Sequence, residues 1–324
     1  MKAIVVTASA LSLCAWGCAN LPVDPARGTL SHTEIYQRAT NEFAEAVFFK
    51  PAEPTISDLT SSLAPLILQE VISRKETQHG LDRFGTLSLS NGVPVLDRSR
   101  PAVYWQADSI ELRGRAHTRF SYIWGYSTGA DGRKRRPGPD NRAMNLVGTR
   151  WNTSLPGVQA EVSVALQGIR ITLNAAGQPV IWEVLADSSG ADLIYVSRNL
   201  EAAAVAEFGQ PLPGRRYTIE CGLEAAPNVI VARIIEDGPV AMGPIVYLTA
   251  GSRAVATVIC RCMTAQAKRL LGTSVYDLVP CQSVAAQSFL TQVRAQAERR
   301  TAFWPGDQPD GNPLEKRLRL PAGF

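Results

Sequence analysis

Histidine is scarce in this sequence: only His32, His79 and His117 occur among its 324 residues. The chain also has no Walker phosphate loop, no G-x-G-x-x-G fingerprint and no histidine-rich metal motif. Beyond the N-terminal region, no segment approaches the roughly 20 consecutive apolar residues of a membrane-spanning helix. These absences argue against nucleotide-dependent and histidine-based metal chemistry, so we expect no cofactor and no metal site.

The overall composition is that of an ordinary globular protein. Apolar residues make up 45% and charged residues 19% of the chain, which excludes disordered and collagen-like classes and permits a sizeable core. The formal charge of +4 is unevenly distributed. Residues 97–150 hold eleven Lys or Arg against five Asp or Glu, whereas the remainder holds 22 basic and 24 acidic residues. Binding that depends on positive charge is therefore expected in that region.

The N-terminus has the features of an export signal. Lys2 precedes an apolar stretch, Ala3–Trp16, that is too short to cross a bilayer as a mature helix. It ends in Ala15-Trp16-Gly17-Cys18, which resembles a bacterial lipobox, although Ala15 stands where leucine is usual. The resemblance implies that Cys18 is acylated and becomes the first mature residue. Ordinary signal-peptidase cleavage after Ala19 is the alternative.

These features predict an outer-membrane lipoprotein facing the periplasm, since Ala19 after the cysteine resembles the outer-membrane sorting pattern. A secreted or soluble periplasmic protein is the alternative. Residues 1–17 are then a signal peptide, 18–30 a tether, 31–303 a single domain and 304–324 a C-terminal tail.

The domain is predicted to have an α+β fold: a largely antiparallel sheet with N-terminal helices and a C-terminal helix packed on it. Residues 31–80 are expected to be helical, because apolar residues recur at helical spacing after the capping box Ser31/Glu34 and again from Leu59 to Val71. Residues 84–280 are expected to be sheet-rich, and 283–300 to form the closing helix.

Within residues 84–280, ten strands are expected: Thr86–Leu89, Val93–Leu96, Ile110–Tyr126, Val158–Leu173, Pro179–Leu185, Leu193–Val196, Tyr217–Cys221, Val229–Ile235, Ile245–Leu248 and Ala254–Cys262. The first two flank Asn91-Gly92, a hairpin turn pair. Two short helices interrupt the strands, one from Asn199 to Phe208 and one from Thr264 to Leu271.

Four cysteines remain besides Cys18 once a signal peptide is removed: Cys221, Cys260, Cys262 and Cys281. In an oxidising compartment they permit disulfides in three connectivities. Cys260 and Cys262 lie two apart at the end of an apolar strand, just before a predicted helix, so a reactive dithiol is one interpretation. A structural role, including a Cys262–Cys281 bond, is favoured. The spacing does not suit a four-cysteine zinc site.

Gly125-Tyr126-Ser127-Thr128-Gly129 matches the G-x-S-x-G nucleophile elbow. The elbow requires a helix directly after the serine and a histidine later in the chain. Here a loop rich in Gly, Pro and Arg follows, and all three histidines precede Ser127. We therefore predict no catalytic residue at this motif and interpret it as a turn, with an unrelated triad using His117 as the remaining alternative.

Ile110–Tyr126 has the clearest pattern in the chain. Its even positions from Leu112 to Tyr126 are mostly apolar or aromatic, and its odd positions hold Arg113, Arg115, His117 and Arg119. On one strand the two sets would occupy opposite faces. The aromatic face is expected to be core. The cationic residues are a candidate anion-binding site, with Arg133–Arg136 nearby. The alternative is a solvated face whose arginines pair with Glu111 and neighbouring acids.

The preferred functional hypothesis is a non-catalytic envelope protein that binds an anionic lipid, an acidic glycan or an envelope protein through this basic β-surface. Nucleic acid is not expected in that compartment. The rival hypothesis is an envelope enzyme, using thiol chemistry at Cys260 and Cys262 or hydrolysis at an unrecognised site.

Overall fold

The computed structural model describes residues 32–39, 42–52, 58–71, 84–90, 93–127, 164–185, 191–225, 229–250, 253–262, 267–283 and 313–324. The predicted signal peptide, tether and lipidation site, the loop that contains Arg133–Arg136, and nearly all of the predicted closing helix lie outside these ranges. The helices are α1 (His32–Arg38), α2 (Leu59–Leu63), α4 (Arg198–Phe208) and α6 (Pro313–Arg317).

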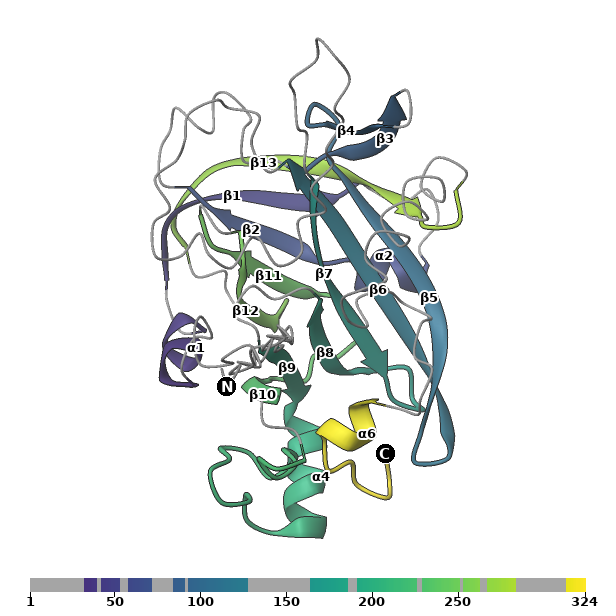
Figure 1. The fold of residues 1–324 in the computed structure, drawn as a ribbon, viewed down its shortest axis with the longest axis vertical. Coiled ribbons are helices and arrows are strands. Elements are labelled where there is room, and N and C mark those ends of the chain that lie inside the picture. The colour runs from purple at the N-terminus through teal and green to yellow at the C-terminus, as the bar shows by residue number, and fades with distance from the viewer. Residues whose placement is uncertain are drawn as a thin grey trace, which may run out of the picture.

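Most of the described chain is strand (Figure 1). The strands are β1 (Phe43–Pro51), β2 (Leu66–Glu70), β3 (Thr86–Ser90), β4 (Val93–Asp97), β5 (Ala102–Leu112), β6 (Arg115–Ser127), β7 (Val164–Leu173), β8 (Pro179–Leu185), β9 (Asp192–Ser197), β10 (Val229–Ile235), β11 (Pro244–Leu248), β12 (Val255–Cys260) and β13 (Ala267–Pro280). Eleven of them form one sheet in the order β10-β9-β8-β7-β6-β5-β13-β1-β2-β11-β12, and β3 and β4 form a separate hairpin.

The predicted α+β fold with a largely antiparallel sheet is wrong. Strands account for 54% and helices for 14% of the described residues, and the sheet is mixed and nearly closed. The run from β5 to β9 is antiparallel. Four pairs are parallel: β9 with β10, β5 with β13, β13 with β1, and β2 with β11. The edge strands β10 and β12 contact each other, and α1 contacts both of them.

The helical prediction for residues 31–80 fails because two of its apolar segments join the sheet. Helix α1 ends at Arg38, and Phe43–Pro51 forms β1 between β13 and β2. After the single turn of α2, Leu66–Glu70 forms β2. The apolar runs Val47-Phe48-Phe49 and Leu66-Ile67-Leu68 are as compatible with a buried strand as with a helix. Each segment forms a strand here because it pairs with a neighbouring strand on both of its sides.

A second error concerns the segment after β12, where a helix ending at Leu271 was predicted. The chain instead forms the 14-residue strand β13 from Ala267 to Pro280. It pairs with β1 along most of its length and with β5 near its end. Thr273, Val275 and Tyr276 are residues that favour strands, and the two neighbouring strands satisfy the backbone of β13.

Several sequence predictions are confirmed, among them the β3–β4 hairpin and the strands that correspond to β8, β9, β10, β11 and β12. The helix predicted to end at Phe208 is α4, although Ser197 rather than Asn199 caps it. The strand predicted at Tyr217–Cys221 is absent, since only Glu220 makes a bridge there, to Leu318. From Pro313 onward, the predicted C-terminal tail forms α6 and contacts the rest of the domain through the Glu220–Leu318 bridge.

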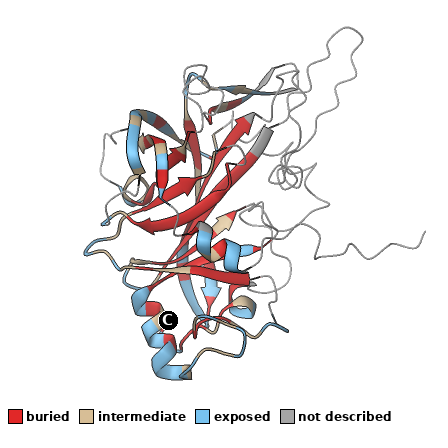
Figure 2. Ribbon diagram, turned by 90° about the vertical axis from the view of Figure 1, so that its left-hand side faces the viewer, coloured by how far each residue is buried: buried red, intermediate tan, exposed pale blue. Residues whose placement is uncertain are grey.

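The main core fills the interior of the curled sheet, and the strands are largely buried in Figure 2. Phe120, Tyr122, Trp124 and Tyr126 lie in this core, which confirms the prediction for the aromatic face. A second cluster joins the ends of β5 and β8–β10 to α4 and to the C-terminal residues. A pocket is lined by residues of both clusters, among them Trp182 and Cys260 of the first and Val180 of the second.

Candidate functional site

A pocket of about 120 Å³ lies where β8 begins and where β10 and β12 end, near the loop 236–243. Its wall includes Val180 and Trp182 of β8, Met242 of the loop, and Cys260 at the end of β12. The mouth of a curled sheet is a common place for a ligand, because strand ends and loops converge there on a rigid scaffold. Cys260 on this wall is one half of a chemical group that can react.

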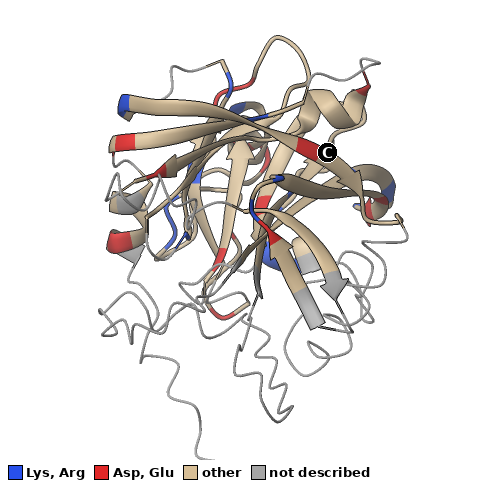
Figure 3. Cartoon of the chain, turned by 90° about the horizontal axis from the view of Figure 1, so that it is seen from above, with Lys and Arg blue, Asp and Glu red and all other residues tan. Residues whose placement is uncertain are grey.

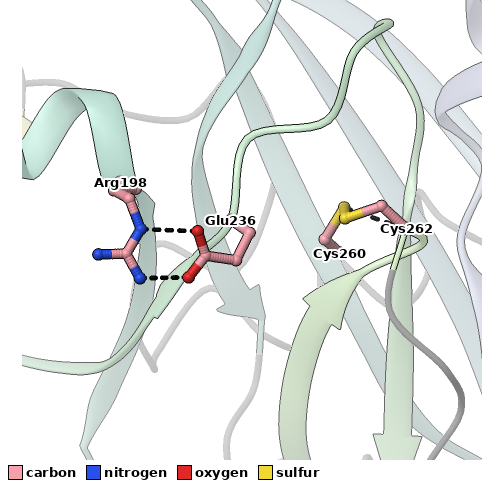
Figure 4. The surroundings of a disulfide bond; sticks show 4 residues. All are labelled: Arg198, Glu236, Cys260 and Cys262. Atoms are coloured by element: carbon pink, nitrogen blue, oxygen red, sulfur yellow. Dashed lines mark hydrogen bonds and ion pairs between the residues drawn. A yellow bond between two sulfur atoms is a disulfide. The ribbon is translucent and has the colours of Figure 1, made fainter.

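That group is a disulfide between Cys260 and Cys262, whose Cα atoms are 5.2 Å apart (Figure 4). Val255–Cys260 is a fully buried apolar strand, and the chain turns immediately after it. The turn brings the second cysteine back to the first. Cys260 is 6% exposed and lines the pocket, whereas Cys262 is exposed. The bonded pair therefore consists of an exposed cysteine and a buried one.

The buried sulfur accepts a hydrogen bond. The backbone N–H of Cys262 donates to Sγ of Cys260 over 3.1 Å. Between them, Arg261 is anchored by a hydrogen bond from its Nη2 to the carbonyl of Ala64. Burial lowers the pKa of Arg261, opposed by the hydroxyls of Tyr276 and Tyr122. The turn that carries the disulfide is thus fixed to the α2 region.

Glu236 and Asp237 adjoin the pocket and hold the N-terminus of α4. Glu236 accepts two hydrogen bonds from Arg198, one of them 2.6 Å from Nε (Figure 4). The hydrogen bond to Arg198 lowers the pKa of Glu236. Asp237 accepts from the backbone N–H of Asn199 at 2.9 Å. Both carboxylates therefore have structural partners and are not arranged as a general acid/base pair.

The other two described cysteines are not part of the site. Cys281 is buried, and burial raises its pKa to about 12. Cys221 is partly buried, which also raises the pKa of its thiol. The Cys262–Cys281 bond considered from the sequence does not form, because Cys262 is bonded to Cys260. Both remaining thiols are mainly protonated at neutral pH and are therefore poor nucleophiles.

The predicted cationic residues do not form one face. Residues 110–126 are two strands joined by a turn, in which Arg113 (φ 51°) and Gly114 (φ 73°) both have left-handed backbones. Arg113 and Arg115 are exposed at this hairpin tip. Gly114 was the signal in the sequence, since hairpin turns of this kind require positive φ.

The other two members of the row are buried. His117 is 2% exposed, stacks on Phe324 at 4.6 Å between ring centroids, and contacts the Leu173 carbonyl through Nδ1. Arg119 is 5% exposed and donates to both carboxylate oxygens of Asp108, at 2.7 and 2.8 Å. This pairing with a neighbouring acid is the alternative weighed from the sequence. Figure 3 accordingly shows basic and acidic residues scattered over the described elements.

Ser127 is the last residue of β6, and the residues after it lie outside the described ranges. His117 lies ten residues earlier on the same strand. At about 3.3 Å per residue, their Cα atoms are on the order of 30 Å apart. A triad that unites His117 with Ser127 is therefore excluded.

Comparisons with known proteins identify no relative. No family model, no curated protein and no solved structure matches the chain. Among the described helices, none is long and apolar enough to span a membrane. Within the described ranges, no group of three or more His, Cys, Asp or Glu side chains is placed to hold a metal ion. Functional inference therefore depends on the geometry of the pocket and its disulfide.

Sequence reasoning found the two cysteines but missed their surroundings. Met242 and Trp182 lie 18 and 78 residues before Cys260, and no local pattern relates them to it. The acid pair Glu236-Asp237 and its partners on α4 become neighbours only because β9 and β10 pair in parallel on either side of that helix in the sequence.

Proposed function

We propose that this chain is an exported protein that carries out thiol–disulfide exchange at Cys260 and Cys262. The observation that supports the proposal is the division of the bonded pair into an exposed residue, Cys262, and a buried one, Cys260, which lies on the wall of a pocket. Exchange requires that division, because one sulfur must be reached by a substrate thiolate and the other must leave and later return.

The reaction has two steps. A substrate thiolate attacks Sγ of Cys262, a new S–S bond forms between them, and the Cys260–Cys262 bond breaks with Cys260 leaving as a thiolate. A second thiolate of the same substrate then attacks the mixed disulfide, forms the substrate disulfide and releases Cys262. Two electrons pass from the substrate dithiol to the protein, and both cysteines take up protons. The reverse sequence oxidises the protein and reduces a substrate disulfide.

Two features favour attack at Cys262 with Cys260 as the leaving group. A substrate thiolate can reach Cys262 more easily than Cys260, because Cys262 is exposed and Cys260 is only 6% exposed. The hydrogen bond from the Cys262 N–H to Sγ of Cys260 stabilises a thiolate at Cys260 more than a thiol. A better leaving thiolate accelerates the exchange step.

The proposed compartment is the bacterial cell envelope, with an N-terminal lipid at Cys18. The signal-like sequence and the lipobox resemblance support it. An envelope location also suits the chemistry, because disulfides persist in oxidising compartments and are kept reduced in the cytosol.

Trapping of mixed disulfides tests the exchange reaction. In Cys260→Ser, the remaining Cys262 should form a stable mixed disulfide with a disulfide-linked model peptide, detected by intact mass. In Cys262→Ser, the buried Cys260 should react at least about 10-fold more slowly. Cys221→Ser is the matched control and should exchange like the parent protein.

A native disulfide that resists dithiothreitol would reject the proposal. Equal trapping rates for the two single-cysteine variants would also reject it, because the division between an exposed and a buried sulfur would then have no chemical consequence.

A second candidate function is binding of an anionic envelope surface at the β5–β6 hairpin. The exposure of both Arg113 and Arg115 at its tip supports it. Arg119 is not part of this proposal, because its charge is paired with Asp108. Reversing Arg113 and Arg115 to Glu should weaken salt-sensitive binding to vesicles that contain phosphatidylglycerol. Arg100→Glu, an exposed residue outside the hairpin, is the control. Unchanged binding by the double variant would exclude this surface.

A further inference from the structure

A methionine lies beside the disulfide. Met242 and Cys260 both line the pocket, and they approach each other over Gly238. A Cβ atom built on Gly238 would lie 3.8 Å from Sγ of Cys260 and 3.8 Å from Cγ of Met242. The two atoms are thus separated by at most twice that distance. The thioether sulfur is one bond beyond Cγ on a flexible side chain, and such side chains adapt readily to their surroundings.

Reduction of the disulfide would leave two thiols close to the Met242 thioether, with Cys260 and Met242 on the pocket wall and Cys262 exposed beside it. Thiolate and thioether ligands are soft, and among biological metals they select monovalent copper. We infer that Cys260, Cys262 and Met242 of the reduced protein form a site for one Cu(I) ion. This inference goes beyond the proposed exchange activity and requires only that dithiothreitol can reduce the disulfide.

The remaining groups around the pocket favour Cu(I) over harder or four-coordinate ions. Glu236 is paired with Arg198, and Asp237 accepts from the N-terminus of α4. Structural zinc sites use four nitrogen or sulfur ligands, and the described part of the chain has no group of three or more His, Cys, Asp or Glu side chains for a metal. The pocket wall has both polar and apolar residues, and its apolar part, which includes Val180 and Trp182, suits an ion of low charge.

Dithiothreitol donates two electrons to the Cys260–Cys262 bond and becomes a cyclic disulfide, and the protein gains two thiols. Cu(I) then binds the two sulfurs as thiolates and displaces two protons, while the uncharged Met242 sulfur adds a third bond. Affinity for copper should consequently rise with pH in the range where the thiols lose their protons.

Anaerobic titration with Cu(I) tests the site. The full chain is reduced with dithiothreitol, desalted and titrated with Cu(I) against bicinchoninate as a competing chelator. One ion per chain is expected. Cys260→Ser and Cys262→Ser should each abolish competition, and Met242→Leu should weaken it by about 10-fold or more. Met144→Leu, the same substitution outside the described residues, is the matched control. Circular dichroism of each variant verifies that it is folded.

Three results would overturn the inference: no binding by the folded, reduced protein, equal affinity of Met242→Leu and the parent, or tighter binding of Zn(II) than of Cu(I). The mixed-disulfide experiment is performed without copper and with a chelator present. A disulfide that resists dithiothreitol would overturn both proposals. Once it is reduced, the outcome of the mixed-disulfide experiment does not depend on the copper titration, and failure of one proposal is distinguishable from failure of the other.

Discussion

At the scale of single residues, the buried guanidinium of Arg119 forms an ion pair with the carboxylate of Asp108. The side chain of Arg119 is 6% exposed and that of Asp108 is 19% exposed. The hydrogen bond to Asp108 raises the pKa of Arg119 against the lowering effect of burial. The guanidinium thus remains charged and depends on this carboxylate.

Asp108→Ala should destabilise the protein by about 2–4 kcal/mol, because it leaves the Arg119 charge buried without its carboxylate partner. Urea denaturation measures the loss in the free energy of unfolding. Ser109→Ala, at an exposed position next in sequence, is the control and should change little. The double variant Asp108→Leu/Arg119→Met should recover much of the loss. Equal stability of Asp108→Ala and the parent would show that water already screens the pair.

The buried thiol of Cys281 gives a prediction for alkaline pH. Its pKa is raised to about 12 by burial, whereas an exposed thiol titrates near pH 8.5. The folded state therefore holds the proton more tightly than the unfolded state does. The stabilisation is complete below about pH 8.5 and is lost as the pH rises from there toward 12.

Burial, assisted by the negative charge of Glu220, also raises the pKa of Tyr36 to about 12. An unfolded tyrosine titrates near pH 10, so this second loss begins at higher pH. Thermal melting between pH 8 and 11 should show a continuous fall in the melting temperature. In Cys281→Ala the fall between about pH 8.5 and 10 should be smaller, and the raised pKa of Cys221 accounts for what remains of it. An equal fall in that variant and the parent would contradict the assignment to Cys281.

At the scale of elements, the β6–β7 pair depends on one glycine. A Cβ on Gly168 would lie 2.3 Å from the backbone carbonyl oxygen of Tyr122 on β6. No real Cβ contact is that short, so a substitution must push the two strands apart. The close approach, and not a special backbone angle, is what requires glycine here.

Gly168→Ala should therefore cost roughly 3 kcal/mol of stability, through displacement of β7 from β6. Gly272→Ala is a matched control in β13, because a Cβ there meets nothing within 4 Å. Chemical denaturation of both variants compares them. Similar stabilities would mean that the sheet adjusts to the added methyl group without cost.

At the scale of the whole molecule, the sheet is nearly closed but lacks hydrogen bonds between its edge strands. Strand β10 pairs with β9, and β12 pairs with β11. The two edges contact each other, and α1 covers them with Ile35, which is fully buried in the main core. Arg233 of β10 also donates to the carbonyl of Ala39 at the end of α1. The contact between β10 and β12 is the seam of the sheet, and the short helix α1 covers it.

Ile35→Ala should destabilise the contact between β10 and β12 more than the rest of the sheet, because α1 loses the buried side chain that packs it against both strands. Hydrogen exchange followed by mass spectrometry should report faster exchange in β10 and β12, with β6 and β7 unchanged. Thr33→Ala, at an exposed position of the same helix, is the control. Uniform acceleration over all strands would indicate global destabilisation and no separate role of α1 at the seam.

The sequence by itself determined the local elements that carry a strong local signal. Alternation and turn residues identified the β3–β4 hairpin and the strands β8 to β12, and the capped apolar pattern identified α4. It also located the cysteine pair at the end of a buried strand. These features depend on side-chain period and turn chemistry within a few residues of one another.

The tertiary structure decided everything that depends on contacts between distant segments. It turned residues 43–51, 66–70 and 267–280 into strands, because sheet neighbours on both sides satisfy their backbones. It buried His117 and Arg119 against Phe324 and Asp108. It joined Cys260 to Cys262 and brought Met242 beside them. Periodicity gives the faces of one strand, but which face is covered depends on what the rest of the chain packs against it.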